Sequence, residues 1–120
     1  MRALAQADAA LLVWWATPVE VASALSRKAR EPSTNAAAVA HAEQLAKQLA
    51  AEWDEVQPTD AVRRTAERLL RTHPLRAADS LQLAAALIAA DHDPATLEFV
   101  CLDARLATAA RIEGFTVIDG

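Results

Sequence analysis

Glycine is scarce in this chain of 120 residues, which contains only Gly114 and Gly120. Loops that bind phosphate groups through backbone N–H groups depend on glycine for their tight turns. Neither the G-x-x-x-x-G-K motif nor the G-x-G-x-x-G motif occurs in the sequence. The sequence therefore argues against a nucleotide site built on a glycine-rich loop.

Cysteine is scarcer still, because Cys101 is the single one. One cysteine excludes an internal disulfide framework and is compatible with a reducing compartment. Cys101 lies within an apolar run, where we expect it to be a small buried hydrophobic residue. The sequence also has no signal peptide, no polybasic tail and no apolar run of about 18 residues. We therefore expect a soluble, cytoplasmic protein with no membrane partner.

The histidines and the charges limit the chemistry further. His41, His73 and His92 lie on separate segments without the spacing of zinc ligands, and no Ser/His/Asp arrangement is supported. The formal net charge is −4, so the whole chain is not a basic coat for nucleic acid. The cationic residues are ten arginines and only two lysines. Because arginine binds phosphate in a bidentate manner, local phosphate contacts remain compatible with this composition.

Apolar runs alternate with helical patterns along the chain, and this alternation predicts an α/β fold with a mainly parallel sheet. The length favours one domain over residues 1–120. Strands are predicted at Leu11–Trp15, Phe99–Leu102 and Phe115–Ile118, with a weaker edge strand within Asp54–Gln57. Helices are predicted at Arg2–Asp8, Thr17–Arg30, Asn35–Trp53, Asp60–Thr72, Leu75–Ala90 and Ala104–Glu113. Thr17 is the expected N-cap of the second of these, and Gly114 is the expected left-handed stop of the last.

Three acidic residues occupy related places in this pattern. Asp79 lies in the first turn of an alanine- and leucine-rich helix that looks buried, where a charge without a partner is costly. Glu20 comes a few residues after the Leu11–Trp15 strand, and Asp103 directly follows Phe99–Leu102. Because ligands bind beyond the carboxyl ends of parallel strands, we expect Glu20, Asp79 and Asp103 at one edge of the sheet.

A cluster of carboxylates needs a compensating charge. Two charges about 5 Å apart repel by roughly 3 kcal/mol at an effective dielectric constant near 20, and a helix N-terminus offsets only about 0.3–1 kcal/mol. Oxygen ligands alone select Mg²⁺ or Mn²⁺ over Zn²⁺, and such a metal can activate water for phosphodiester hydrolysis. Taken singly, Glu20 is an ordinary first-turn glutamate and Asp103 an ordinary N-cap, so the joint pattern favours a site more than any one acid does.

Three blocks of sequence resemble the motifs of PIN-domain ribonucleases, and most of all those of VapC-type toxins. The blocks are Thr-Pro-Val-Glu-Val-Ala-Ser-Ala-Leu at 17–25, Leu-Arg-Ala-Ala-Asp-Ser-Leu-Gln-Leu-Ala at 75–84, and Phe-Val-Cys-Leu-Asp-Ala-Arg-Leu-Ala at 99–107, followed by Ala110 and Gly114. The resemblance spans about Ala9 to Ile118. It implies a three-layer α/β/α sandwich, Mg²⁺- or Mn²⁺-dependent RNA cleavage, an antitoxin partner and a homodimer. The family's acidic positions map onto Glu20, Asp79 and Asp103.

The chain departs from the family at its first acid. That acid is an aspartate that ends the central first strand in a hydrophobic-Asp-Thr/Ser-Ser motif, and Asp8 does not match it. We expect the missing strand to lie before Met1, with a shortened copy of doubtful activity as the alternative. Cys101 also stands where the family often has threonine or serine, whose hydroxyl can assist the metal site.

Arg76 and Arg105 are the predicted RNA contacts, because each lies near a proposed catalytic acid. The sequence thus predicts a metal-dependent endoribonuclease, a hydrolase that acts as the toxin of a toxin–antitoxin pair. Two alternatives remain open. One is a catalytically inactive remnant that only binds an antitoxin or a sister subunit, and the other is an unrelated α/β ligand-binding domain.

Overall fold

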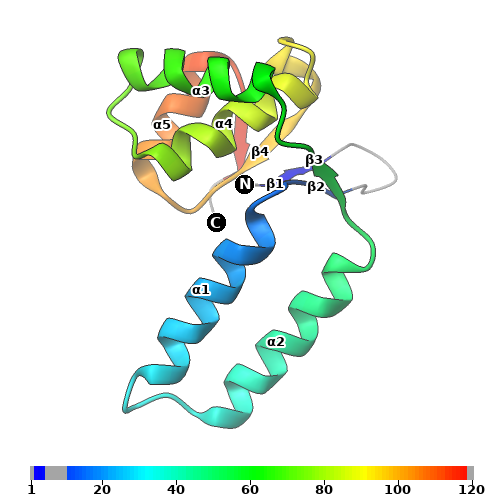
Figure 1. Cartoon of the computed structure of the whole chain (residues 1–120), viewed down its shortest axis with the longest axis vertical. Coiled ribbons are helices and arrows are strands. Elements are labelled where there is room, and N and C mark those ends of the chain that lie inside the picture. Colours follow the sequence, from blue (N-terminus) through cyan, green and yellow to red (C-terminus); the bar gives the residue numbers. More distant parts are fainter. Residues whose placement is uncertain (1, 5–10, 119–120) are drawn as a thin grey trace. The chain divides into compact units, whose positions relative to one another are not determined.

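The structure, a computed structural model, describes residues 2–4 and 11–118, and the side chains of residues 11–118. The chain divides into two compact units, shown in Figure 1. The sheet unit consists of Met1–Trp15 with Asp54–Gly120, and the hairpin unit consists of Ala16–Trp53. The expectation of one PIN-like domain over residues 1–120 stays a prediction.

The sheet unit contains a five-stranded mixed sheet. Its strands are β1 (Arg2–Leu4), β2 (Leu11–Trp14), β3 (Asp54–Val56), β4 (Glu98–Val100) and β5 (Thr116–Ile118), in the order β3-β2-β1-β4-β5. The β2–β3 and β4–β5 pairs are parallel, whereas β1 runs antiparallel to both of its neighbours. β2, β3, β4 and β5 therefore share one direction, and the α/β class predicted from the sequence is confirmed.

The central strand β1 corrects one prediction. Arg2–Asp8 was expected to form a helix, but Arg2–Leu4 forms a strand, with Ala3 opposite Leu12 on one side and Phe99 on the other. The predicted helix rested on alanine-rich composition, which is a weak prior that tertiary context overrides. Here the strand completes the hydrogen-bonding ladders of both β2 and β4, whose backbone groups need partners. Asp8 lies outside the described residues.

Three helices and one short 3₁₀ turn build the rest of the sheet unit. They are α3 (Asp60–Thr72), α4 (Ala77–Ala89), η1 (Pro94–Thr96) and α5 (Ala104–Glu113). α3 packs on α4, whose Leu83, Ala84 and Ala85 are fully buried, so the alanines allow a close approach of the neighbouring helix. The helix predicted from Leu75 begins two residues later, at Ala77.

Gly114 ends α5 in the predicted left-handed conformation, with a φ of 110°. A Cβ atom at this position would lie 2.9 Å from Cγ of Pro94, so the glycine also allows η1 to approach. The next residue, Phe115, packs against Phe99 of β4 with ring centroids 5.5 Å apart. The glycine that ends α5 is therefore followed immediately by a residue of the core of the sheet unit.

The two adjacent tryptophans divide between core and surface. Trp14 ends β2 and is 4% exposed, whereas Trp15 is 51% exposed and lies beyond the strand. The backbone N–H of Trp15 donates to the carbonyl of Val56 at 3.0 Å. Trp14 therefore belongs to the core of the sheet unit, and Trp15 does not.

The hairpin unit consists of α1 (Thr17–Arg30) and α2 (Ala36–Ala50). Ala16 is the N-cap of α1, so the expected cap at Thr17 is wrong by one residue, and Pro18 lies in the first turn as predicted. Asn35 caps α2, because its Oδ1 accepts a hydrogen bond of 2.9 Å from the N–H of Ala37. α2 ends at Ala50 rather than at the predicted Trp53.

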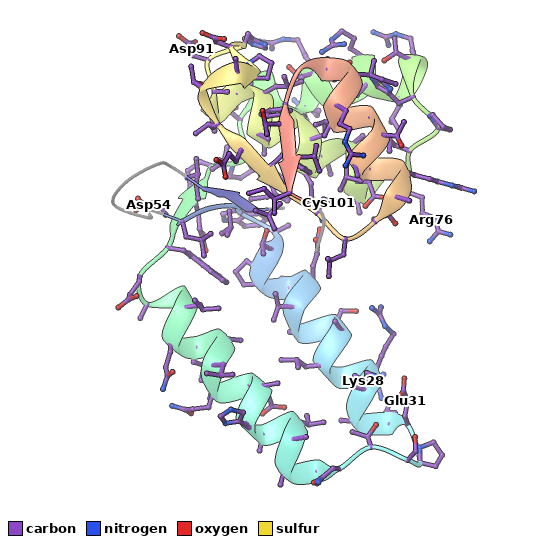
Figure 2. All side chains as sticks on the ribbon, turned by 180° about the vertical axis from the view of Figure 1, so that it is seen from behind. Lys28, Glu31, Asp54, Arg76, Asp91 and Cys101 are labelled. Carbon is purple, nitrogen blue, oxygen red and sulfur yellow. The ribbon has the colours of Figure 1, made fainter. Side chains whose placement is uncertain are left out.

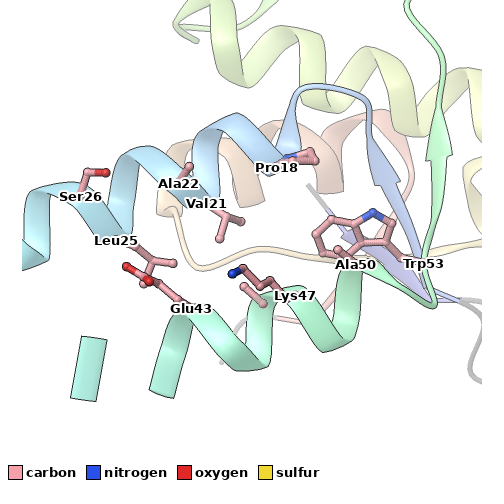
Figure 3. Close-up of a pocket in the computed structure, with 10 residues that line it drawn as sticks. Pro18, Val21, Ala22, Leu25, Ser26, Glu43, Lys47, Ala50 and Trp53 are labelled. Atoms are coloured by element: carbon pink, nitrogen blue, oxygen red, sulfur yellow. The ribbon is translucent and has the colours of Figure 1, made fainter. Parts of the chain in front are cut away.

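A groove of about 290 Å³ runs between the two helices of the hairpin unit. Figure 3 shows Val21 and Leu25 from α1 facing it, together with Lys47 from α2 and Trp53. The lining side chains are mostly apolar, as is typical of the facing sides of two amphipathic helices. None of the helices in the described part of the chain is long and apolar enough to cross a membrane.

Candidate acidic site

Asp79 lies in the first turn of α4, as the sequence predicted. Its side chain is half-buried, at the end of a helix whose following turns belong to the core. The next residue, Ser80, is 1% exposed and its hydroxyl donates to the carbonyl of Ala77 at 3.0 Å. This bond satisfies the buried hydroxyl within the first turn, and the turn presents Asp79 toward the protein surface.

Asp103 is the N-cap of α5. Its Oδ1 accepts a hydrogen bond of 2.9 Å from the N–H of Leu106, which satisfies one donor of the first helical turn. Cys101, just before it, is 8% exposed, and its thiol donates to the carbonyl of Asp103 at 3.3 Å. Burial raises the pKa of the Cys101 thiol. The predicted role of Cys101 as a buried small residue is thereby confirmed.

The two aspartates line one hollow of about 250 Å³, which we call the acidic hollow. Its lining residues are Pro74, Arg76, Asp79, Asp103 and Arg105. Figure 2 labels Arg76 and Cys101 near the loop that joins β4 to α5. The structure therefore brings together two of the three predicted acids and both arginines predicted to contact RNA.

Burial and the charges that line the acidic hollow change the pKa of Asp79. Burial raises the pKa of this carboxyl, and repulsion from the Asp103 carboxylate raises it further. The positive charge of Arg76 acts in the opposite direction but does not cancel these two effects. The charged form of Asp79 is consequently less favourable than it would be in water. A cation placed between the two acids would stabilise that charged form.

Glu20 belongs to the hairpin unit, where it lies in the first turn of α1 with an intermediate exposure. Asp79 and Asp103 belong to the sheet unit, so the placement of Glu20 beside them stays a prediction. Across residues 2–4 and 11–118, no three side chains of Asp, Glu, His or Cys form a group that could hold a metal ion. The acidic hollow, as described, supplies two acidic side chains.

A second cluster, which the sequence did not predict, lies next to the acidic hollow. Nε2 of His73 lies 2.7 Å from Oε2 of Glu113, and Nη2 of Arg68 donates to Oε1 of Glu113 at 3.1 Å. Burial by itself raises the pKa of Glu113, but the hydrogen bonds from Arg68 and His73 outweigh it and hold the pKa below its usual value. The cluster ties the end of α3 to the end of α5.

His73 immediately precedes Pro74, a lining residue of the acidic hollow. The sequence marks His73-Pro74 only as a helix break, and Glu113 only as the last residue of a helix. The contact between His73 and Glu113 joins positions 40 residues apart, so no local spacing could have indicated it. It helps to fix the turn that carries Pro74 and Arg76.

Glu113→Gln is expected to lower the free energy of unfolding by about 1–3 kcal/mol at pH 7, because it leaves the buried His73 and the Arg68 guanidinium without a charged acceptor. The folded pKa of Glu113 lies below its unfolded value of 4.5. Its contribution is therefore complete above that value and is lost as the pH falls through the folded pKa. Urea unfolding of both proteins at pH 7 and at about pH 3 measures this.

The control for Glu113→Gln is Glu67→Gln, because Glu67 is an exposed glutamate on α3. We expect this control to change stability by no more than about 0.5 kcal/mol. An equal loss for Glu113→Gln at both pH values would show that its effect comes from packing and not from the charge.

The acidic hollow combines two kinds of chemistry in one place. The carboxylates of Asp79 and Asp103 can bind a hard divalent cation, and the guanidinium groups of Arg76 and Arg105 can bind phosphate oxygens. The positive charge of Arg76 also lowers the pKa of Asp79 and so opposes the effects of burial and of Asp103. No protein-family model, no curated protein and no solved structure matches the chain.

Proposed function

We propose that the chain is a metal-dependent endoribonuclease that hydrolyses RNA phosphodiester bonds and acts as the toxin of a toxin–antitoxin pair. The observation that carries the proposal is the acidic hollow, where Asp79 and Asp103 lie with Arg76 and Arg105. The similarity of the three sequence blocks to PIN-domain ribonucleases supports the same function. A PIN-like three-layer sandwich, an antitoxin partner and a homodimer form part of the proposal.

The residues of the acidic hollow fit a Mg²⁺ or Mn²⁺ ion. Asp103 uses Oδ1 to cap α5, which leaves Oδ2 for a cation. Burial and then the Asp103 carboxylate raise the pKa of Asp79, and a cation bound beside it would favour the charged form. Oxygen ligands favour these two ions over zinc. Glu20 is the proposed third ligand. When bound, the ion supplies Lewis acidity and lowers the pKa of a coordinated water.

The chain's own residues contribute positioning and charge. Arg76 and Arg105 bind the phosphate oxygens of the RNA backbone and orient the scissile bond beside the acids. The cap of α5 fixes the direction of the Asp103 carboxylate, and Asp79 stands in the first turn of α4, whose following turns are buried. Both acids are thus held on rigid helices, which gives a site the precision that hydrolysis requires.

RNA cleavage with Mg²⁺ or Mn²⁺ and its loss on chelation test the proposal. We expect single-stranded RNA to be cut when either ion is present and to stay intact in EDTA. The same ions should raise the midpoint of thermal unfolding, because a ligand at ten times its dissociation constant stabilises the folded state by about 1.4 kcal/mol. NaCl at matched ionic strength controls for screening.

Two results would contradict the proposal. Intact RNA under every metal condition, with the protein still folded, favours the inactive remnant that only binds a partner. Cleavage that is unaffected by EDTA would overturn the metal dependence. If a divalent ion binds but RNA stays intact, the acidic hollow is an ion site and the nuclease part of the proposal is wrong.

A further inference from the structure

A second concave surface adjoins the acidic hollow within the sheet unit. It has a volume of about 250 Å³, and we call it the side hollow. It lies between the His73-Pro74 turn and α5, whose Arg105, Thr108 and Ile112 line it. Pro74 and Arg105 line both hollows, so the two are direct neighbours. A molecule held in one can therefore reach into the other.

The side hollow is lined by one exposed apolar side chain and by residues that are buried or held by a hydrogen bond. Ile112 is 69% exposed, although it lies on a helix whose opposite face supplies buried residues to the core. Ala109, which also lines the side hollow, is 2% exposed, and His73 is held by its 2.7 Å contact with Glu113. Pro74, Ala109 and Ile112 thus form a continuous apolar lining on one concave surface, whereas a single exposed apolar residue would need no explanation.

Polar groups occur at two points of the side hollow. The hydroxyl of Thr108 donates to the carbonyl of Ala104 at 2.9 Å, so its oxygen remains able to accept a hydrogen bond. Arg105 carries a planar guanidinium group between this surface and the acidic hollow. Such a group binds phosphate at its edge and stacks on aromatic rings with its face. The combination suits an aromatic ring that carries N–H donors and is attached to a phosphate.

We propose that the side hollow receives an unpaired nucleobase of RNA, next to the phosphate that is held in the acidic hollow. This inference rests on the proposed function and extends it to substrate selection. Proteins read single-stranded RNA mainly through unstacked bases that stack on aromatic side chains or on the planes of arginine guanidinium groups, and Arg105 supplies such a plane here. The continuity of the side hollow with a site for an anionic phosphate favours a nucleotide over an apolar peptide.

The test measures binding of a short single-stranded oligoribonucleotide by fluorescence anisotropy, in EDTA to prevent cleavage. Ile112→Ser is expected to weaken binding about fivefold, because it removes apolar surface that the base would cover. Leu70→Ser, which alters an exposed leucine on α3, is the matched control and should bind as the wild type does. Both variants change exposed side chains and should leave the fold intact.

A set of oligoribonucleotides, each with one abasic position, then shows whether a base is involved. We expect one abasic position to weaken binding to the wild type but to have little effect on binding to Ile112→Ser. If the abasic position and Ile112→Ser weakened binding independently, so that their effects multiplied, the side hollow would not be the site that holds the base. Unchanged RNA binding by Ile112→Ser would also overturn the proposed base-binding role of the side hollow. If the same variant changed the oligomeric state in sedimentation, the side hollow would instead be a contact between copies of the chain.

The two proposals can fail separately. If the protein binds and cleaves RNA but Ile112→Ser behaves as the wild type, only the base subsite is wrong. If the wild type neither binds nor cleaves RNA, the proposed function fails and the base subsite fails with it. If cleavage and binding both hold, the cleavage pattern of Ile112→Ser should lose part of the wild type's preference for the base beside the cut.

Discussion

Asp79→Asn is expected to lower the rate of RNA cleavage by about 100-fold while leaving the protein folded. The substitution keeps the size and shape of the side chain but removes the charge that a divalent cation needs. Loss of about 3 kcal/mol of electrostatic stabilisation in the transition state corresponds to a rate lower by about 100-fold. Because Asp79 lines the acidic hollow with Asp103, Arg76 and Arg105, the loss should appear in the rate of cleavage at saturating RNA.

The same substitution is expected to raise stability in the absence of metal. Burial and the neighbouring Asp103 raise the pKa of Asp79 above its ordinary value of 3.8, so the folded state holds the proton more tightly than the unfolded state does. For such a group, stability falls as the pH rises from the unfolded pKa through the folded pKa. The asparagine side chain carries no charge, so the variant should not show this loss at neutral pH. The increase in melting temperature caused by Mg²⁺ or Mn²⁺ should shrink.

The matched control for Asp79→Asn is Asp91→Asn. Asp91 lies just beyond the other end of α4, is exposed and has a φ of 53°, a conformation that asparagine adopts readily. This control should cleave RNA at the wild-type rate. Undiminished cleavage by Asp79→Asn would remove this residue from the metal site. If Asp79→Asn loses cleavage and circular dichroism shows that it is unfolded, the loss comes from the fold, and Asp79 has a structural role.

The local parts of the fold were predictable because they depend on neighbouring residues. The alanine- and leucine-rich run at 77–89, the stop at Gly114 and the cap at Asp103 each follow from side chains within one or two helical turns. Asp79 and Asp103 could be proposed as a pair because each stands at the head of a helix that follows a predicted break or strand. The rule for ligand sites in parallel sheets then places such positions at one edge.

The parts that were missed depend on distant residues. β1 is a strand because β2 and β4 flank it, and composition alone favours a helix there. The contacts of Glu113 join it to His73 and Arg68, 40 and 45 positions away, and neither separation leaves a periodic signal. The side hollow was missed for the same reason, because the His73-Pro74 turn and α5 meet only in the folded chain.

Asp103 has two roles in the proposed site, and two substitutions separate them. Its Oδ1 caps α5 through the N–H of Leu106, and its charge is proposed to bind the metal. Asn is about as good an N-cap as Asp, so Asp103→Asn should keep the stability of the wild type and lower the cleavage rate by about 100-fold. Asp103→Ala should lose the same activity and also about 1 kcal/mol of stability.

The control for the cap is Thr59→Ala, because the Thr59 hydroxyl accepts a hydrogen bond from the N–H of Val62 at the start of α3, at 3.3 Å. This variant should lose a similar amount of stability and retain cleavage. Urea unfolding and RNA cleavage, measured on all three variants, therefore give three different combinations of outcomes. If Asp103→Asn cleaves RNA as fast as the wild type does, Asp103 is a helix cap only, and the acidic hollow would retain Asp79 as its single metal-binding aspartate.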